Sequence, residues 1–367
     1  MQAEREVPSI PAWSADQLDS SVPPEPEAPY FDTALNAWVL SRHADILAAF
    51  RSSSLFPASS DSTKPVQPSA EADHLQMRSE TKEALPPSRL NAWRDELLPQ
   101  AESLAETLPV SAVTDEPVDL LEAYARPLCL TLAAMVTEIS RDVAQKLCER
   151  ARRVSAASAE PYDPGLRPVS ELAEEELRGC FPSGPESLRA SGFVALSQTM
   201  PCLLGNAWYA LIQHPEEWGL LHREPALLDQ GVEELLRYAG LVRILGRAAT
   251  ADVHLNGVVI RQGDRVILRI IAGNHDPERF SQQNGIDCTR RDAGHLTLGA
   301  GPHACVGASL IRMAATTITG PLLRRFALAT PSAPVEWQGG SGFRSPRALW
   351  VRLTGNGGRL HAGFGSN

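Results

Sequence analysis

A glycine-rich stretch near the C-terminal end of the chain has residues suited to metal chemistry. It reads Leu298-Gly299-Ala300-Gly301-Pro302-His303-Ala304-Cys305-Val306-Gly307 and precedes a segment of helical composition. A cysteine at a helix start has its thiolate stabilised by free backbone N–H groups, and flanking glycines let a flat cofactor approach the backbone closely. Cys305 is therefore a candidate metal ligand, although a small buried thiol is the commoner reason for a cysteine in such a loop.

The surroundings of Cys305 bear on which metal it would bind. Zinc needs three or four ligands at short spacing, and no second Cys or His pair accompanies His303 and Cys305. The sequence Cys305-Val306-Gly307-Ala308 also lacks the motif for covalent haem attachment. One axial bond to a non-covalent haem fits this arrangement best.

Two pairs of charged residues have helical spacing. His74 and Arg78 are four residues apart and can point at one anionic group, although such a pair is more often solvated surface. Glu234 and Arg237 are three residues apart, and an exposed pair of this kind contributes less than about 1 kcal/mol. Taken alone, neither pair distinguishes a functional site from ordinary surface charge, so each must be interpreted together with the other motifs.

Together these motifs make the sequence similar to the cytochrome P450 family, from about Trp38 to Leu353. The cysteine loop resembles the signature Phe-Gly-x-Gly-x-His-x-Cys-x-Gly, with Leu298 in place of Phe. Glu234-Leu235-Leu236-Arg237 resembles the family's Glu-x-x-Arg, and Asn274-His275-Asp276-Pro277 resembles the segment ahead of the ligand loop. The resemblance implies a mainly α fold with small β-sheets (α+β), and haem b bound non-covalently through the thiolate of Cys305.

The resemblance also implies which residues contact the haem. His74 and Arg78 match the family's His-x-x-x-Arg, which meets the haem propionates. Arg247 matches another propionate-binding arginine, and His303 a further propionate contact. The remaining cofactor contacts are expected from the loop itself, at Leu298, Gly299 and Gly307.

In the family, the pair that Glu234 and Arg237 match has a structural role. It is buried beside the ligand loop and completed by a second arginine. Alignment places Gly285 at the position of that arginine, and Arg279 is close enough in sequence to substitute for it.

A long helix expected over residues 191–214 departs from the family pattern. The family commonly has Ala-Gly-x-Asp/Glu-Thr where this helix passes the cofactor, and this chain has Ala195-Leu196-Ser197-Gln198-Thr199. The resemblance implies that Thr199 is catalytic, through a hydrogen bond to bound oxygen. Gln198 can orient water but cannot ionise as a carboxylate does. Leu196 replaces a glycine that normally gives oxygen room.

Pro201 follows this motif and bears on the same helix. Because proline has no N–H, the carbonyl of Ser197 should lose its helical partner, and we expect a kink. The freed carbonyl could hold a water on a replacement proton path. An equally weighted alternative is that Pro201 only shapes the packing.

Other patterns predict the elements that carry these residues. They indicate a strand at 37–40, a helix at 44–50, a structureless loop at 52–73, a helix at about 225–238 and a hairpin at 253–260 with an Asn-Gly turn. The helix after Cys305 is expected to reach about Thr319 and to end at Gly320-Pro321. Few residues separate Ser155 from Ser191, so the substrate-covering lid before the long helix should be shortened and the pocket open.

The chain has 367 residues, of which 43% are hydrophobic, which is enough for a large core. We expect an extended arm at 1–29, one haem-binding domain at 30–353 and a flexible tail at 354–367. The formal net charge of −10 disfavours nucleic acid or an anionic membrane as partner. No apolar run of about 20 residues and no basic-then-apolar leader is present, so a cytoplasmic protein is expected.

These observations lead us to expect a haem-thiolate monooxygenase that uses O2 and two electrons to hydroxylate or epoxidise an organic substrate in secondary-metabolite biosynthesis. A separate ferredoxin and ferredoxin reductase are the expected electron donors, docking on a basic patch formed by Arg290, Arg291, Arg312, Arg324 and Arg325. The substrate is an organic small molecule, or one bound to a carrier or peptide. The alternatives are oxidative coupling or peroxygenase chemistry, and a catalytically silent homologue that acts as a partner protein.

Overall fold

The computed structural model describes residues 27–33, 35–57, 68–110, 116–161, 163, 165–182, 188–280 and 285–355, with no side-chain description at 56, 57 and 68–74. Most of the expected N-terminal arm, the tail beyond residue 355 and part of the expected loop 52–73 lie outside these ranges. Thr354 and Gly355 belong to a paired strand, so the first two residues of the expected tail are not a tail.

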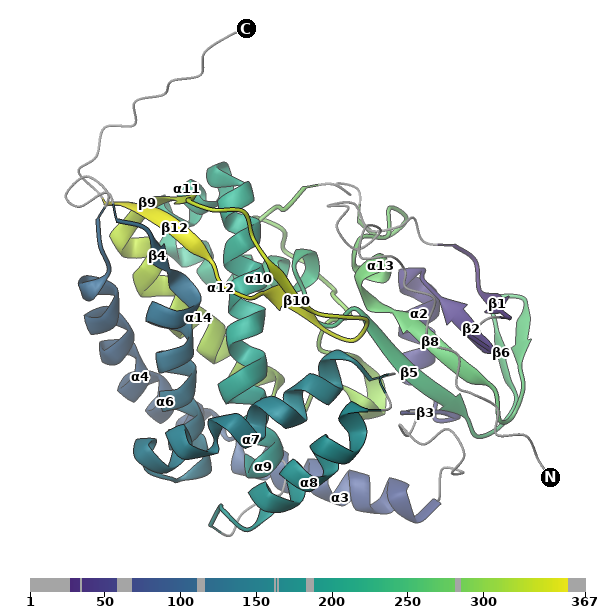
Figure 1. Ribbon diagram of the computed structural model, residues 1–367. Helices are drawn as coiled ribbons and strands as arrows, with labels where there is room; N and C mark the ends of the chain where they lie inside the picture. The colour runs from purple at the N-terminus through teal and green to yellow at the C-terminus, as the bar shows by residue number, and fades with distance from the viewer. Residues whose placement is uncertain are drawn as a thin grey trace, which may run out of the picture.

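The molecule has a large helical part and a smaller β-rich part (Figure 1). The α-helices are α2 (His43–Arg51), α3 (Pro68–Ala84), α4 (Pro87–Thr107), α6 (Arg126–Thr137), α7 (Arg141–Ala159), α8 (Leu166–Arg178), α9 (Ala190–Val194), α10 (Met200–Gln213), α11 (Pro215–Arg223), α12 (Leu228–Tyr238), α13 (Ile270–Asn274) and α14 (Ala308–Arg325). Short turns of π-helix occur at η1 (Leu121–Ala125) and η3 (Ala195–Thr199), and of 3-10 helix at η4 (Pro225–Leu227) and η5 (Gly301–His303). The expected mainly α fold with small sheets is confirmed.

The largest sheet has the strand order β1-β2-β8-β5-β3. Its strands are β1 (Tyr30–Asp32), β2 (Ala37–Leu40), β3 (Leu55–Pro57), β5 (Ile244–Ala249) and β8 (Arg265–Arg269). Strands β2 and β8 pair in parallel, whereas β5 pairs antiparallel to β8 and β3. This sheet packs on α2 through an apolar cluster that contains Leu40, Phe50 and Leu268 and is separate from the main core among the helices.

Three smaller sheets complete the β structure. The order β4-β12-β9 joins β4 (Val118–Asp119), β12 (Trp350–Gly355) and β9 (Phe326–Pro331). Strand β10 (Trp337–Gly339) pairs with β11 (Arg344–Pro346), and β6 (Val253–Leu255) pairs with β7 (Val258–Ile260). Asn256 and Gly257 at the last turn have φ values of 43° and 87°, which confirms the Asn-Gly hairpin.

The main hydrophobic core lies among the helices, and it corrects one expectation. Helix α14 does not end at Gly320-Pro321 but continues to Arg325. Pro321 removes one backbone hydrogen bond, whereas continuing the helix buries Ile318, Leu322 and Leu323 completely or nearly so. Each such side chain contributes about 1.5–3 kcal/mol on burial, which outweighs the lost bond.

The expected loop 52–73 is also partly wrong. Leu55–Pro57 form strand β3, which pairs with β5, and α3 begins at Pro68. Leu55 is 1% exposed, so the short apolar sequence Leu55-Phe56 begins a strand within a Ser- and Pro-rich stretch.

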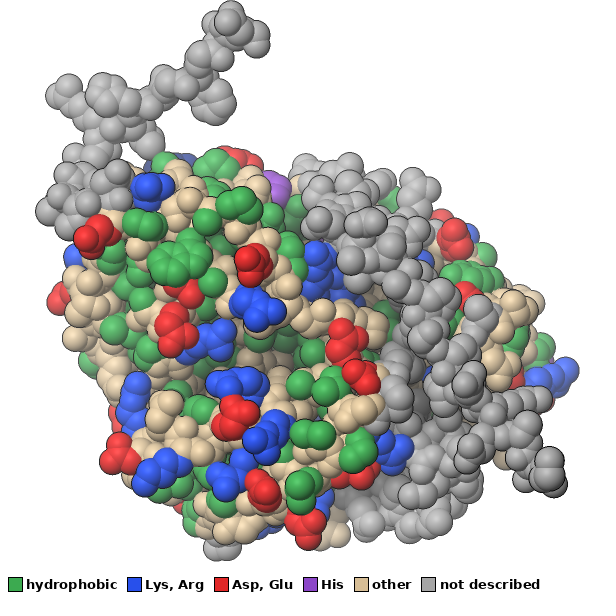
Figure 2. Space-filling model, viewed as in Figure 1, with side chains coloured by type: hydrophobic (Ala, Val, Ile, Leu, Met, Phe, Trp, Pro, Cys, Tyr) green, Lys and Arg blue, Asp and Glu red, His purple; other side chains and the backbone are tan. Residues whose placement is uncertain are grey.

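The expected lid region, residues 155–191, contains the end of α7 and the helix α8, and α8 is the single helix described between α7 and α9. The two helices are tied by Arg150 Nε and Glu176 Oε2 at 2.8 Å. On the face that they present in Figure 2, Lys and Arg side chains alternate with Asp and Glu.

Candidate haem site

The cysteine loop is folded back on itself before α14. The N–H of Cys305 donates to the carbonyl of Leu298 at 2.7 Å, which closes the loop. Gly299 and Gly301 have φ values of 69° and 68°, a region that favours glycine. A Cβ on Gly301 would lie 2.4 Å from the carbonyl oxygen of Phe50 in α2, so this glycine also permits the close approach of the loop to the sheet domain.

The thiol of Cys305 lies two residues before Gly307, which is the N-cap of α14. Burial raises the pKa of Cys305, while the N–H of Gly307 and the positive charges of Arg78 and Arg312 act in the opposite direction. A bound metal deprotonates such a thiol outright. Among the described residues, no group of three or more His, Cys, Asp and Glu side chains is arranged to hold a metal ion.

Arg78 reaches the cysteine loop from α3. Its Nη1 donates to the carbonyl of Ala304 at 2.5 Å, directly beside Cys305. His74 lies one turn earlier on the same helix, and its side chain is outside the described part of the chain. His303 is half-buried at the end of η5, within the same loop. The structure thus brings Arg78 to the loop that contains His303 and Cys305.

Arg247 provides the test of whether the residues fit a haem. It lies on β5 and is 6% exposed, and burial lowers its pKa to about 10. The Nη1 atom donates to the carbonyl of Gly246 at 2.9 Å, and the guanidinium lies over the ring of Phe50 at 5.4 Å. Among the described residues no carboxylate pairs with it. A buried cation needs an anion, and a haem propionate supplies one, so the residues present fit the group.

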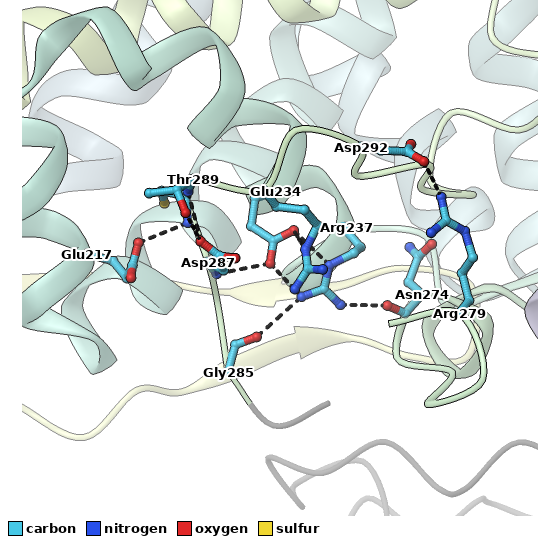
Figure 3. A network of polar contacts seen from close by, with 11 residues as sticks. Glu217, Glu234, Arg237, Asn274, Arg279, Gly285, Asp287, Thr289 and Asp292 are labelled. Carbon is cyan, nitrogen blue, oxygen red and sulfur yellow. Dashed lines mark hydrogen bonds and ion pairs between the residues drawn. The ribbon is translucent and has the colours of Figure 1, made fainter. Parts of the chain in front are cut away.

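Glu234 and Arg237 form a fully buried pair at the end of α12 (Figure 3). Two parallel bonds join them, from Nε to Oε2 at 2.8 Å and from Nη2 to Oε1 at 2.6 Å. Arg237 also donates to the carbonyls of Asn274 and Gly285. This bidentate geometry fixes α12 against the segment that leads to the cysteine loop.

The second arginine of this network is Arg290, which the sequence did not identify. Its Nε donates to Glu234 Oε2 at 2.9 Å, and its side chain is 14% exposed. Arg279 does not substitute, because it pairs with Asp292 at 2.7 Å, away from Glu234 (Figure 3). Arg290 lies five residues beyond Gly285, the position where the second arginine was expected. An arginine a few residues beyond Gly285 was the available signal.

The long helix is not uniform where it carries Thr199 and Gln198. The N–H of Met200 donates to the carbonyl of Ala195, five residues back, so residues 195–199 form the π-turn η3. Ala195 is exposed, while Gln198 and Thr199 are half-buried. These three residues are therefore the less buried ones of the turn. Leu196 is instead buried in the main core at 3% exposure.

The expected break at Pro201 therefore takes the form of a π-turn directly before it. Pro201 is buried in the first turn of α10. The hydroxyl of Ser197 accepts a hydrogen bond from Gln198 Nε2 at 3.3 Å and is buried. Thr199 and Gln198 lie together on η3, whereas Cys305 lies in the loop that precedes α14.

The five arginines expected to form one docking patch are divided between two places. Arg290, Arg291 and Arg312 line a cavity of about 780 Å³ that also contains Asp229, Glu233 and Asp292. Arg312 pairs with Glu233 at 2.5 Å. Arg324 and Arg325 line a separate cavity with Glu102 and Glu106. The patch is therefore mixed in charge and mostly paired.

None of the described helices has the length and apolar character needed to cross a membrane.

Comparison with known proteins identifies similar sequences. The family described as Cytochrome P450 matches residues 223–344. A relative named "Cytochrome P450 CYP107DY1", from Priestia megaterium, is 46% identical over 35% of this chain, and the match spans about a third (32%) of that relative. The 20-oxo-5-O-mycaminosyltylactone 23-monooxygenase of Streptomyces fradiae is 30% identical over 81% of this chain and 79% of its own length.

A solved structure is similar in fold. It is P450BioI in complex with hexadec-9Z-enoic acid ligated Acyl Carrier Protein, with a TM-score of 0.73 and 22% identity. The match covers 86% of this chain and 91% of that one. At this identity the likeness concerns the fold alone.

Proposed function

This chain belongs to the cytochrome P450 family, and from this premise we propose that it is a monooxygenase of secondary metabolism that inserts oxygen into a bulky organic substrate. Family membership gives haem b, with a cysteine thiolate as axial ligand, as the cofactor. We assign that thiolate to Cys305. When bound, the haem supplies activation of O2 and transfer of one oxygen atom to the substrate.

The observation that carries this proposal is the arrangement of positive groups around the cysteine loop. Arg78 contacts the loop at Ala304, and the buried Arg247 has no carboxylate partner among the described residues. The two arginines would hold the haem propionates through charge-assisted hydrogen bonds. His303 would add a contact from the loop itself, and His74 one from α3.

Glu234, Arg237 and Arg290 have a positioning role in this proposal. Their network is closed within the protein, because both oxygens of Glu234 are engaged by arginines and by the N–H of Asp287 at 3.0 Å. It therefore fixes the loop that presents Cys305 and does not touch the substrate.

Thr199 and Gln198 would serve the distal side of the cofactor. A threonine hydroxyl can both donate and accept a hydrogen bond, and an amide can orient water. Because Gln198 cannot ionise, the proton must reach the site through hydroxyl groups and water. The contact between Gln198 Nε2 and Ser197 Oγ orients the amide for this task.

A separate ferredoxin and its reductase are the proposed electron donors, as is usual in bacterial members of the family. The second candidate function is peroxide-driven oxidation, and Gln198 at the position of the usual acid favours it. A carrier-bound substrate is a further candidate, since a fold neighbour is described with an acyl carrier protein and the lid α7–α8 is short.

The experiment that tests the proposal begins with haem content and the carbon monoxide difference spectrum of the purified protein. Turnover is then compared with NAD(P)H, ferredoxin and reductase, and with hydrogen peroxide alone. Oxidation supported by the electron donors would favour the monooxygenase. Haem-free protein, or protein with haem that neither oxidant system turns over, would contradict it.

A further inference from the structure

Arg243 is a positively charged residue that has no acidic partner in the described chain. It lies directly before β5, and its side chain is half-buried. The charges that act on it are those of Arg344 and Arg269, both positive. Burying a cation without a counter-charge costs desolvation free energy. An anion from outside the chain would offset this cost at Arg243.

The backbone places Arg243 on the same side as Arg247. Residues four apart in an extended segment point to the same face, and they are separated by about 13 Å. Arg247 is the residue assigned above to a haem propionate. If Arg247 holds a haem propionate, Arg243 would lie on the same face, one strand segment further from that contact.

The hairpin β10–β11 forms the other wall around Arg243. The N–H of Arg243 donates to the carbonyl of Gly342 at 2.9 Å, and Val242 forms a β-bridge with Phe343. The same hairpin is tied to α10, because Asn206 Nδ2 donates to the carbonyl of Arg344 at 2.9 Å. Asn206 lies two helical turns, about 10 Å, beyond Thr199. The hairpin thus links Arg243 on one side to α10, the helix that follows Thr199, on the other.

The local electrostatics favour an anion at this place. Burial, then Arg344 and Arg269, lower the pKa of Arg243 to about 10, so it stays charged at neutral pH. Arg344 lies over the ring of Trp337 at 4.5 Å. Glu160, at the end of helix α7, accepts a hydrogen bond from the N–H of Ser341 at 3.4 Å and is therefore engaged by the backbone of the same hairpin.

We propose that Arg243 is a specificity-determining residue that binds an anionic group of the substrate, either a free carboxylate or the phosphate of a phosphopantetheine-bound acyl chain. The proposal rests on the function proposed above, because the substrate in question is the one oxidised at the haem. A guanidinium offers two parallel hydrogen bonds to either oxyanion, which explains arginine at this position.

The test measures ligand binding to the haem-loaded protein, by the change in haem absorbance and by calorimetry. One arm uses a panel of aliphatic and aromatic carboxylic acids, each beside its methyl ester. The other arm uses hexadecanoyl phosphopantetheine beside hexadecanoyl pantetheine, which lacks the phosphate. The proteins are the wild type, Arg243→Gln, Arg243→Lys and the control Arg261→Gln, whose arginine pairs with Asp252 on the β6–β7 side.

The wild type should bind the anionic member of at least one arm about tenfold to a hundredfold more tightly than its neutral counterpart. Arg243→Gln should lose this preference, Arg243→Lys should keep part of it, and Arg261→Gln should keep all of it. The arm that shows the preference identifies the source of the anion.

Three results would overturn the assignment. The wild type shows no preference for anions in either arm, Arg243→Gln keeps the preference, or Arg243→Gln loses haem as readily as an Arg247 variant, which would make Arg243 a cofactor contact. The carbon monoxide spectrum of the same wild-type sample reports the haem-thiolate bond independently. Failure of the proposed function is therefore seen separately from failure of this assignment.

Discussion

At the scale of single residues, the site is defined by how its charges are compensated. Glu234 is fully buried and has two arginines around it, whereas Arg247 is almost fully buried and has no acid among the described residues. The first arrangement is stable because the buried carboxylate is paired within the protein. The second needs a negatively charged group of a ligand to compensate the buried guanidinium.

Arg290→Gln should destabilise the folded protein strongly. The change leaves a buried carboxylate with one arginine fewer, and breaking a buried pair costs about 3–5 kcal/mol. Denaturant unfolding of the haem-loaded protein measures the loss. Arg279→Gln is the matched control, because its pair with Asp292 is exposed and worth less than about 1 kcal/mol. Equal effects of the two changes would contradict the network described here.

Arg247→Gln should weaken haem retention with little loss of apoprotein stability, since the neutral amide removes an uncompensated buried charge. The rate of haem transfer to an excess of a haem-scavenging globin should rise about tenfold or more, the value of one charge-assisted hydrogen bond. An unchanged transfer rate would remove Arg247 from the propionate site.

At the scale of elements, the sequence correctly predicted the helices and the hairpin, whose formation depends on residues close together in the chain. The hairpin 253–260 follows from Asn-Gly, and the helices follow from apolar spacing. The continuation of α14 through Pro321 and the strand at 55–57 were missed, because burial by distant residues decided both. The motif residues Arg78, His303 and Cys305 could be predicted to meet; Arg290 and Arg243 could not, because their roles depend on loop length and on the hairpin β10–β11.

Gly301→Ala should reduce haem loading. A Cβ at this position would lie 2.4 Å from the carbonyl oxygen of Phe50, and the positive φ alone costs about 1–2 kcal/mol for alanine. Gly179→Ala is the control, since nothing lies within 4 Å of its Cβ and its φ is −81°. The ratio of haem to protein after purification tests the difference, and normal loading of Gly301→Ala would count against the close approach of loop and α2.

Pro201→Ala tests the π-turn η3. Restoring the N–H lets residues 197–201 return to regular α-helical bonding, which would rotate Gln198 and Thr199 away from their present face. We expect a lower fraction of electrons to appear in product, measured as product formed per NAD(P)H consumed. An unchanged ratio would leave Pro201 with a packing role only.

At the scale of the whole molecule, the charges around the 780 Å³ cavity affect how strongly a charged partner protein can dock there, and the lining contains both arginines and acidic residues. Arginines there are mostly paired, so an acidic ferredoxin would gain only screened attraction. Turnover with ferredoxin should therefore fall only modestly, by less than about tenfold, between 50 and about 200 mM salt. A steeper fall would indicate a strongly basic docking surface.

The central claim is that the Cys305 thiolate is the axial ligand of haem b. The carbon monoxide difference spectrum of the reduced protein tests it most directly, with Cys305→Ser compared against Cys180→Ser. We expect a haem-thiolate band in the wild type and in Cys180→Ser, and its loss in Cys305→Ser. A Cys305→Ser protein that keeps the band would contradict the account.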